Sequence, residues 1–142
     1  MIDSSSAGPL VGLTALIVDD DEEARRVWKQ LLSTAITGTL TAEAQDGAEA
    51  LHLARTLQPD IILMDIVMPK IDGLEVTRQL KRDPSTSHIA VIAITGRQFS
   101  AQAAIDAGCN GYLTKPVEPE KLLQELSRVL RRDVRGRGAR LA

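Results

Sequence analysis

Aspartates follow apolar runs at two places in the sequence. Asp19–Asp21 come directly after Ala15–Val18, and Asp65 comes directly after Ile61–Met64. Two carboxylates ~4 Å apart repel each other by about 4 kcal/mol at an effective dielectric of 20. A group of them therefore needs a bound cation or a shared proton. Because the chain has no His or Cys cluster at ligand spacing, an all-oxygen site is expected, which suits Mg2+ or Mn2+.

A threonine and a lysine come at the ends of two further apolar runs. Thr95 follows Val91–Ile94, and Lys115 comes just after Gly111–Leu113. A lysine ammonium and a threonine hydroxyl can bind the oxygens of a phosphoryl group, whose transfer depends on positioning and on neutralising charge. Asp65 is then the nucleophile, and its carboxylate would form an acyl phosphate. These residues together predict metal-dependent phosphoryl transfer to Asp65.

Short apolar runs alternate with helical patterns along the chain, and they predict the elements that bring these side chains together. Three of the runs are almost continuously apolar, which is typical of parallel strands covered on both faces. The pattern predicts an α/β fold with a doubly wound five-stranded parallel sheet and five helices. Ligands of such sheets bind at the carboxyl ends of the strands. The strands are expected at residues 15–18, 40–42, 61–64, 91–94 and 111–113.

Apolar periodicity predicts the five helices. In the first, Ala24, Val27, Leu31 and Ala35 are expected to form the buried stripe, which Leu32 and a partly packed Trp28 widen. An exposed Trp28 that contacts a partner protein is the alternative, since aromatic residues are favoured at the centres of interfaces. The other four helices are expected after Asp46, near Gly73, from about Ser100 to Gly108, and over the stripe from Leu122 to Leu130.

The composition is that of an ordinary globular protein. Of 142 residues, 44% are hydrophobic and 25% are charged, and no apolar run reaches the ~20 residues that a membrane span needs. The single cysteine and the lack of a secretion signal favour a cytoplasmic location. Residues 131–142 carry a net charge of +4 and the remainder –6, which disfavours nucleic-acid binding by the main body. We expect a flexible leader at 1–12, one domain at 13–131 and a basic tail at 132–142.

Five motifs, in this order, resemble the receiver domains of two-component response regulators. The resemblance extends from about Thr14 to Leu130 and implies a flavodoxin-like fold with strand order 2-1-3-4-5. It also implies a stand-alone switch that accepts a phosphoryl group from a phosphohistidine of a histidine kinase or a histidine phosphotransfer protein. The motifs are Leu16–Asp21, Ile62–Pro69, Ile71–Gly73, Ala93–Gly96 and Gly111–Pro116.

The resemblance implies a role for each acidic residue. Asp65 is the phosphorylated residue and a metal ligand. Asp20 binds the metal directly, whereas Asp19 binds it mainly through water. The backbone carbonyl of Val67 completes the protein ligands of Mg2+ or Mn2+.

The resemblance also implies how phosphorylation is sensed. Thr95 and Lys115 bind the phosphoryl group, and Tyr112 is the aromatic residue that turns inward when Thr95 moves. The Lys115–Pro116 peptide bond is expected to be cis, at the low cost that X-Pro bonds allow. The side chains of Val67 and Arg97 tune the phosphoryl lifetime. Thr95 and Tyr112 are 17 positions apart, about two fewer than in common family members, which predicts a trimmed loop or fourth helix.

Other functions fit the sequence less well. A haloacid-dehalogenase-like phosphatase needs an Asp-x-Asp loop after the first strand and a cap, and a nucleotide-binding domain needs a glycine-rich phosphate loop. About twelve residues follow the fifth helix, too few for a helix-turn-helix DNA-binding domain. A phosphate-independent interaction module on the same fold is the alternative. The sequence identifies neither the kinase nor the downstream protein target, and it leaves homodimer formation open.

Overall fold

Strands and helices alternate along the whole described part of the chain. The computed structural model describes residues 12–66, 72–96 and 101–141, with side chains of the last segment described as far as Leu130. Residues 1–11 of the expected leader at 1–12 lie outside these ranges. The elements are β1 (Thr14–Val18), α1 (Glu22–Ala35), β2 (Leu40–Ala44), α2 (Gly47–Leu57), β3 (Ile61–Asp65), α3 (Gly73–Arg82), β4 (Ala90–Thr95), α4 (Ala101–Ala107), β5 (Gly111–Thr114) and α5 (Pro119–Leu141).

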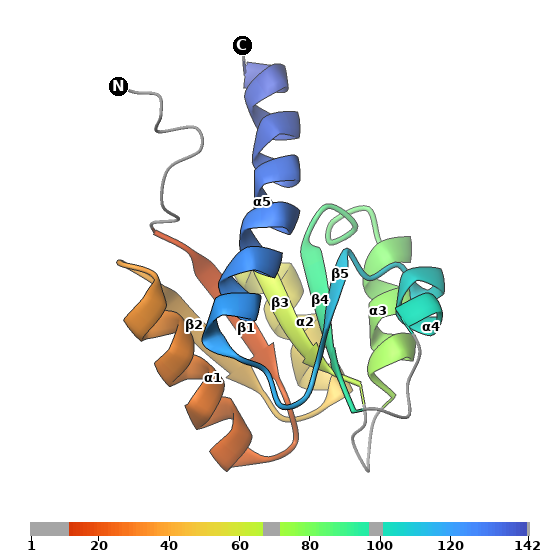
Figure 1. Cartoon of the computed structure of the whole chain (residues 1–142). Helices are drawn as coiled ribbons and strands as arrows, with labels where there is room; N and C mark the ends of the chain where they lie inside the picture. Colours follow the sequence, from red (N-terminus) through yellow and green to blue (C-terminus); the bar gives the residue numbers. More distant parts are fainter. Residues whose placement is uncertain (1–11, 67–71, 97–100, 142) are drawn as a thin grey trace.

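All five strands form one sheet in the order β2-β1-β3-β4-β5, and every neighbouring pair is parallel. The predicted flavodoxin-like α/β fold is therefore confirmed. Because parallel strands end at the same side, the residues after β1, β3, β4 and β5 meet at one edge, the lower edge in Figure 1. The chain thus gathers residues from four separate segments at a single edge.

Helices cover both faces of the sheet, with α1 and α5 on one face and α2, α3 and α4 on the other (Figure 1). The central strand β3 is buried on both faces, and its residues alternate between the two cores. Ile61 and Leu63 pack with α1 and α5, whereas Ile62 and Met64 pack with the other three helices. This double covering explains the continuous apolar run that precedes Asp65.

Aspartates cap the first three helices. Asp21, Asp46 and Asp72 each accept a hydrogen bond from a backbone N–H in the first turn of α1, α2 and α3, respectively. A side-chain oxygen at this position satisfies one of the N–H groups that the helix itself leaves unpaired. Of the three consecutive aspartates after β1, Asp21 therefore starts α1, which leaves Asp19 and Asp20 for other contacts.

The predicted buried stripe of α1 is shifted by one residue at two of its positions, whereas Ala24 and Leu31 are half-buried as members of it. Val27 is 53% exposed and Ala35 is exposed, whereas Trp28 and Leu32 are buried at 8% and 0% exposure. Because one residue turns a helix by about 100°, the shift brings the large Trp28 side chain into the core and turns Val27 to the surface. The prediction that Trp28 packs in the core is confirmed.

α5 extends beyond the predicted apolar stripe. It continues past Leu130 to Leu141, and Figure 1 shows it projecting past the edge of the sheet opposite the strand ends. Residues 132–141 of the expected basic tail at 132–142 are therefore helical. The boundaries of leader, domain and tail stay predictions. Within the described ranges, none of the helices combines the length and apolar character that crossing a membrane requires.

Candidate functional site

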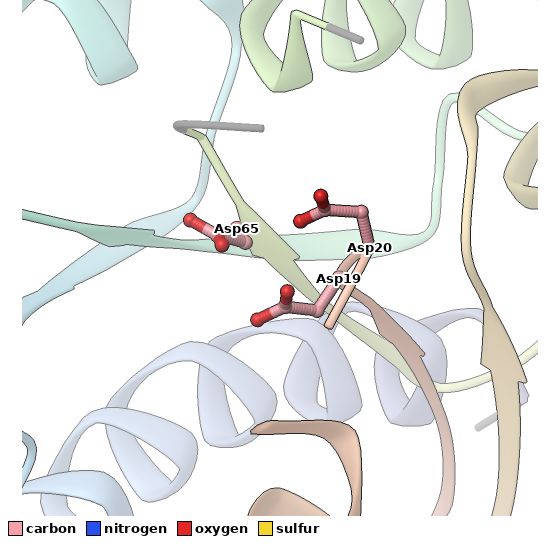
Figure 2. Close-up of side chains that lie close together, drawn as sticks. All are labelled: Asp19, Asp20 and Asp65. Carbon is pink, nitrogen blue, oxygen red and sulfur yellow. The ribbon is translucent and has the colours of Figure 1, made fainter. Parts of the chain in front are cut away.

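Three carboxylates converge at the carboxyl edge of the sheet. Asp19 and Asp20 follow β1, and Asp65 is the last residue of β3. One oxygen from each lies within 4.8 Å of the others, and Figure 2 shows the three side chains extending toward the same space. Asp19 and Asp65 are only 2% and 5% exposed, whereas Asp20 is exposed. The predicted convergence is confirmed.

One oxygen of Asp19 is buried without a partner. Its Oδ1 accepts a hydrogen bond of 2.9 Å from the Asp21 N–H, whereas no hydrogen bond to Oδ2 is found within the described ranges. Burial raises the pKa of the Asp19 carboxyl from 3.8 to about 6, and the nearby Asp65 carboxylate acts in the same direction. A buried, unpaired carboxylate oxygen is costly, so Oδ2 needs a proton or a cation.

The residues present fit a hard divalent cation. Within the described ranges, the group contains carboxylates only, with no His or Cys, and its exposed member Asp20 leaves a side open to water. Mg2+ takes one or two carboxylates, keeps several waters and shares phosphoryl oxygens, as such an arrangement allows. Val67, whose backbone carbonyl is a predicted ligand, lies outside the described residues.

Lys115 brings a positive charge to the same site. Its Nζ lies 3.4 Å from Oδ2 of Asp65, and its backbone N–H donates to the Thr95 carbonyl at 2.8 Å. The Lys115–Pro116 peptide bond is cis, as predicted. Lys115 is therefore held next to Asp65 by the end of β4, and the ammonium is half-exposed.

Thr95 and Tyr112 lie on neighbouring strands, β4 and β5. The Thr95 side chain is 2% exposed, and its hydroxyl donates a long hydrogen bond of 3.4 Å to the Leu113 carbonyl. Tyr112 is 39% exposed, so its ring lies outward. The inward turn of Tyr112 stays a prediction. Arg97, and the part of the predicted trimmed segment at 97–100 that includes the Ser100 helix start, lie outside the described residues.

The sequence marks Gly73 as a helix start and as part of the Ile71–Gly73 motif, and the structure shows the reason for a glycine there. A Cβ at Gly73 would lie 2.6 Å from the Asp65 carbonyl oxygen and 3.0 Å from the Ile66 Cα. The first residue of α3 therefore packs directly against the backbone of Asp65. The glycine in the Ile71–Gly73 motif was the available signal, but its spacing does not reveal which backbone it approaches.

Sequence reasoning missed Arg25 entirely. Its Nη1 donates to the backbone carbonyl of Asp19 at 2.7 Å, and its Nε donates to Glu43 on β2 at 2.9 Å. Arginine is common on helix surfaces, and nothing in the spacing along the chain singles this one out. Its role depends on the position of β2 beside β1.

Comparison with known proteins agrees with this geometry. Residues 15–127 match the family model of the response regulator receiver domain. The chemotaxis protein CheY of Halobacterium salinarum is 34% identical over 115 residues, which cover 81% of this chain and 94% of CheY. The nitrate/nitrite response regulator NarL of Escherichia coli K12 is 37% identical over 113 residues, 80% of this chain and 52% of NarL. The chain thus spans about half the length of several curated relatives.

Solved structures show the same fold. The chemotaxis protein CheY4 of Vibrio cholerae is 30% identical, with a TM-score of 0.74 over 82% of this chain and 98% of that one. The receiver domain of a sensor histidine kinase from Pseudomonas aeruginosa PAO1 is 28% identical, with a TM-score of 0.75 over 84% of this chain and 98% of that one. That structure has a magnesium ion coordinated in its active site cleft. By its family match, its sheet order and its relatives, the chain belongs to the response regulator receiver domains.

Proposed function

We propose that this receiver domain accepts a phosphoryl group on Asp65, in the presence of Mg2+ or Mn2+, and that phosphorylation changes its binding to a protein partner. The donor is a phosphohistidine of a histidine kinase or a histidine phosphotransfer protein. One observation carries the proposal: three carboxylates lie within 4.8 Å of one another, and the Lys115 ammonium lies 3.4 Å from Asp65. This arrangement suits phosphoryl transfer, which rests on positioning and charge neutralisation.

In the proposed reaction, an oxygen of the Asp65 carboxylate attacks phosphorus. The P–N bond to the donor histidine breaks, the imidazole nitrogen keeps the electron pair and takes up a proton, and an acyl phosphate forms on Asp65. A divalent cation held by Asp19, Asp20, Asp65 and the Val67 carbonyl would supply positive charge to the phosphoryl oxygens. Lys115, which follows β5 on the side of β3 away from β1, would supply a second positive charge.

Thr95 and Tyr112 would convert phosphorylation into a change of surface. The Thr95 hydroxyl is 3.4 Å from the Leu113 carbonyl, at the weak end of hydrogen-bond distances. It can therefore exchange this bond for one to a phosphoryl oxygen. Tyr112, half-exposed on the adjacent strand, would then turn inward and alter the surface of β5. A phosphoacceptor switch of this kind turns over no separate substrate, apart from slow hydrolysis of its own acyl phosphate.

Labelling with acetyl phosphate tests the proposal. Incubation with acetyl phosphate and Mg2+, followed by intact mass measurement, is expected to add one phosphoryl group. Asp65→Ala and chelation of Mg2+ are each expected to abolish the addition, whereas Asp106→Asn on α4, an exposed acid, is expected to label normally. Labelling that survives in Asp65→Ala would reassign the acceptor. Failure to label with acetyl phosphate and with phosphohistidine donors would favour the phosphate-independent interaction module.

The proposal places the protein in the cytoplasm with a histidine kinase or phosphotransfer protein as its donor and a downstream protein as its target. The lack of a DNA-binding domain stays a prediction, because relatives such as NarL extend well beyond the matched residues. The formation of a homodimer stays a prediction as well.

A further inference from the structure

Arg25, in the first turn of α1, connects the acidic loop to the neighbouring strand. Its side chain is only 12% exposed. Nη1 donates to the backbone carbonyl of Asp19 at 2.7 Å, and Nε donates to Oε1 of Glu43 at 2.9 Å. A guanidinium can hold two such acceptors at once because its donors are arranged as a rigid, planar fork. Arg25 therefore joins β1, α1 and β2 at the edge of the sheet where the carboxylates gather.

The hydrogen bonds of Asp19 show what this contact accomplishes. The N–H of Asp19 donates to the Ala44 carbonyl at 3.1 Å, its carbonyl accepts from Arg25, and its Oδ1 accepts from the Asp21 N–H at 2.9 Å. Only Oδ2, buried beside Asp65, has no hydrogen-bond partner within the described ranges. The protein thus pairs the backbone and Oδ1 of Asp19 and leaves Oδ2 unpaired among the described residues, on a side chain that extends toward the other two carboxylates (Figure 2).

From this arrangement we infer that Arg25 is a positioning residue for the metal site. It holds the backbone of Asp19 so that Oδ2 points at the cation, or at a water bound to the cation, before the cation arrives. The inference rests on the proposed function, because it concerns the affinity of the same carboxylate group for Mg2+. Residues that orient metal ligands in this way commonly account for 10–100-fold in metal affinity.

Glu43 offsets the positive charge of Arg25 beside the proposed cation site. A lone guanidinium beside three carboxylates would oppose the binding of a second cation. The Glu43 carboxylate, 2.9 Å from Nε, balances the charge of Arg25, so the pair is neutral as a unit. Arg25 can therefore hold Asp19 in place with little electrostatic penalty for metal binding. Because it preorganises Asp19, we expect Arg25 to raise the affinity for Mg2+.

Calorimetric titration with Mg2+ tests the inference on the whole chain. Arg25→Met is expected to raise the dissociation constant for Mg2+ about tenfold. Arg25→Lys keeps the charge and the aliphatic stem but lacks the fork that reaches both acceptors. Its thermal midpoint in EDTA is therefore expected within a few degrees of wild type, while its Mg2+ affinity stays as weak as that of Arg25→Met. If Arg25 had a purely structural role, a variant with nearly wild-type stability in EDTA would also bind Mg2+ with nearly wild-type affinity.

Arg26 provides a matched control on the same helix. It is 69% exposed, and its ion pair with Glu22 is long, at 3.8 Å, so Arg26→Met is expected to bind Mg2+ as wild type does. Wild-type Mg2+ affinity in both Arg25 variants would overturn the inference, whatever their thermal midpoints, and would leave the proposed function intact. A wild-type chain that shows neither Mg2+ binding nor labelling of Asp65 would overturn both.

Discussion

Lys115 and Asp65 are fifty residues apart in the sequence, and their side chains meet at 3.4 Å. The carboxylate of Asp65 is 6% exposed, whereas the lysine side chain is 43% exposed. The acid is thus held in the edge of the sheet, and the ammonium approaches it from the solvent side. From this geometry we expect Lys115 to weaken the binding of a cation and to favour the transfer of a phosphoryl group.

Replacing Lys115 by glutamine is expected to strengthen Mg2+ binding and to slow phosphorylation. Removal of a positive charge next to Asp65 favours a divalent cation several-fold, whereas the incoming phosphoryl group loses a stabilising charge, so we expect labelling by acetyl phosphate to slow at least tenfold. Calorimetry and the time course of intact mass measure the two effects. Lys29→Gln, the same change at an exposed position of α1, serves as the control. A variant that binds Mg2+ more weakly and is labelled more slowly, or one that binds it more tightly and is labelled faster, would contradict this account.

Without metal, the contribution of Asp19 to the stability of the protein is expected to fall as the pH rises from about 4 to about 6. The folded pKa of Asp19 is raised from 3.8 to about 6, so over this interval the folded state holds a proton that the unfolded state has released. Folding is therefore opposed at neutral pH, by about 3 kcal/mol at most. Urea unfolding in EDTA between pH 4 and pH 7 measures the slope.

Asp19→Asn isolates this contribution, because asparagine does not titrate. The difference in unfolding free energy between variant and wild type is expected to favour the variant increasingly as the pH rises through this interval. Other acids give the unfolding free energy an opposite dependence on pH. One is Glu125, because its hydrogen bond with Arg128 lowers its pKa. Both proteins share this dependence, so the difference between them removes it. An unchanged difference between pH 4 and pH 7 would show that Asp19 titrates normally.

Magnesium is expected to reverse the destabilisation. A ligand that binds only the folded state adds about 2.7 kcal/mol at 100 times its dissociation constant. Because protons compete for the Asp19 carboxylate, the gain in thermal midpoint should be larger at pH 7 than at pH 5. Asp20→Asn, which removes the exposed acid of the group, should lose most of the gain with little change in EDTA. Equal gains in wild type and Asp20→Asn would exclude Asp20 as a ligand.

Gly73→Ala is expected to impair labelling of Asp65 more than it impairs folding. The new Cβ would meet the Asp65 carbonyl oxygen at 2.6 Å, so the backbone that carries the acceptor has to shift, and shifts of this size are costly for catalysis. Gly111→Ala is the matched control, since its Cβ would meet the end of the Glu125 side chain, which can move away. Urea unfolding measures the stability of each variant, and acetyl phosphate labelling measures its rate of phosphorylation. A slower rate in Gly73→Ala than in Gly111→Ala, for a similar loss of stability, is expected. Similar labelling rates in the two variants would contradict the close contact as the cause.

Lys81→Met is expected to destabilise the fold by about 1–3 kcal/mol. The Lys81 ammonium, at the end of α3, donates to the Ile89 and Ser87 carbonyls at 2.6 and 3.2 Å and to the Asn110 side chain at 3.0 Å. Arg55→Met removes an exposed ion pair with Asp83 and should cost under 1 kcal/mol. Urea unfolding of both variants gives the comparison, and an equal loss would remove the special role of Lys81.

Local signals in the sequence are enough to locate the strands and most helices, and to identify the residues at the strand ends. Apolar runs mark the strands, and Asp46 and Gly73 mark the predicted starts of two helices, because these signals act between residues close together in the chain. Since all five strands are parallel, Asp19, Asp20 and Asp65 had to reach the same edge once strand order was known. The motifs that resemble a known family supplied that order.

The lateral contacts that support the site depend on how distant segments of the chain pack against one another. The bond from Arg25 to Asp19 depends on Glu43 in the adjacent strand, and the need for Gly73 depends on how closely α3 approaches β3. The rotation of α1 that buries Trp28 and exposes Val27 likewise results from packing against the sheet. Spacing along a chain encodes the period of an element but not the distance or rotation between two elements, because these are set by the packing of side chains from distant segments.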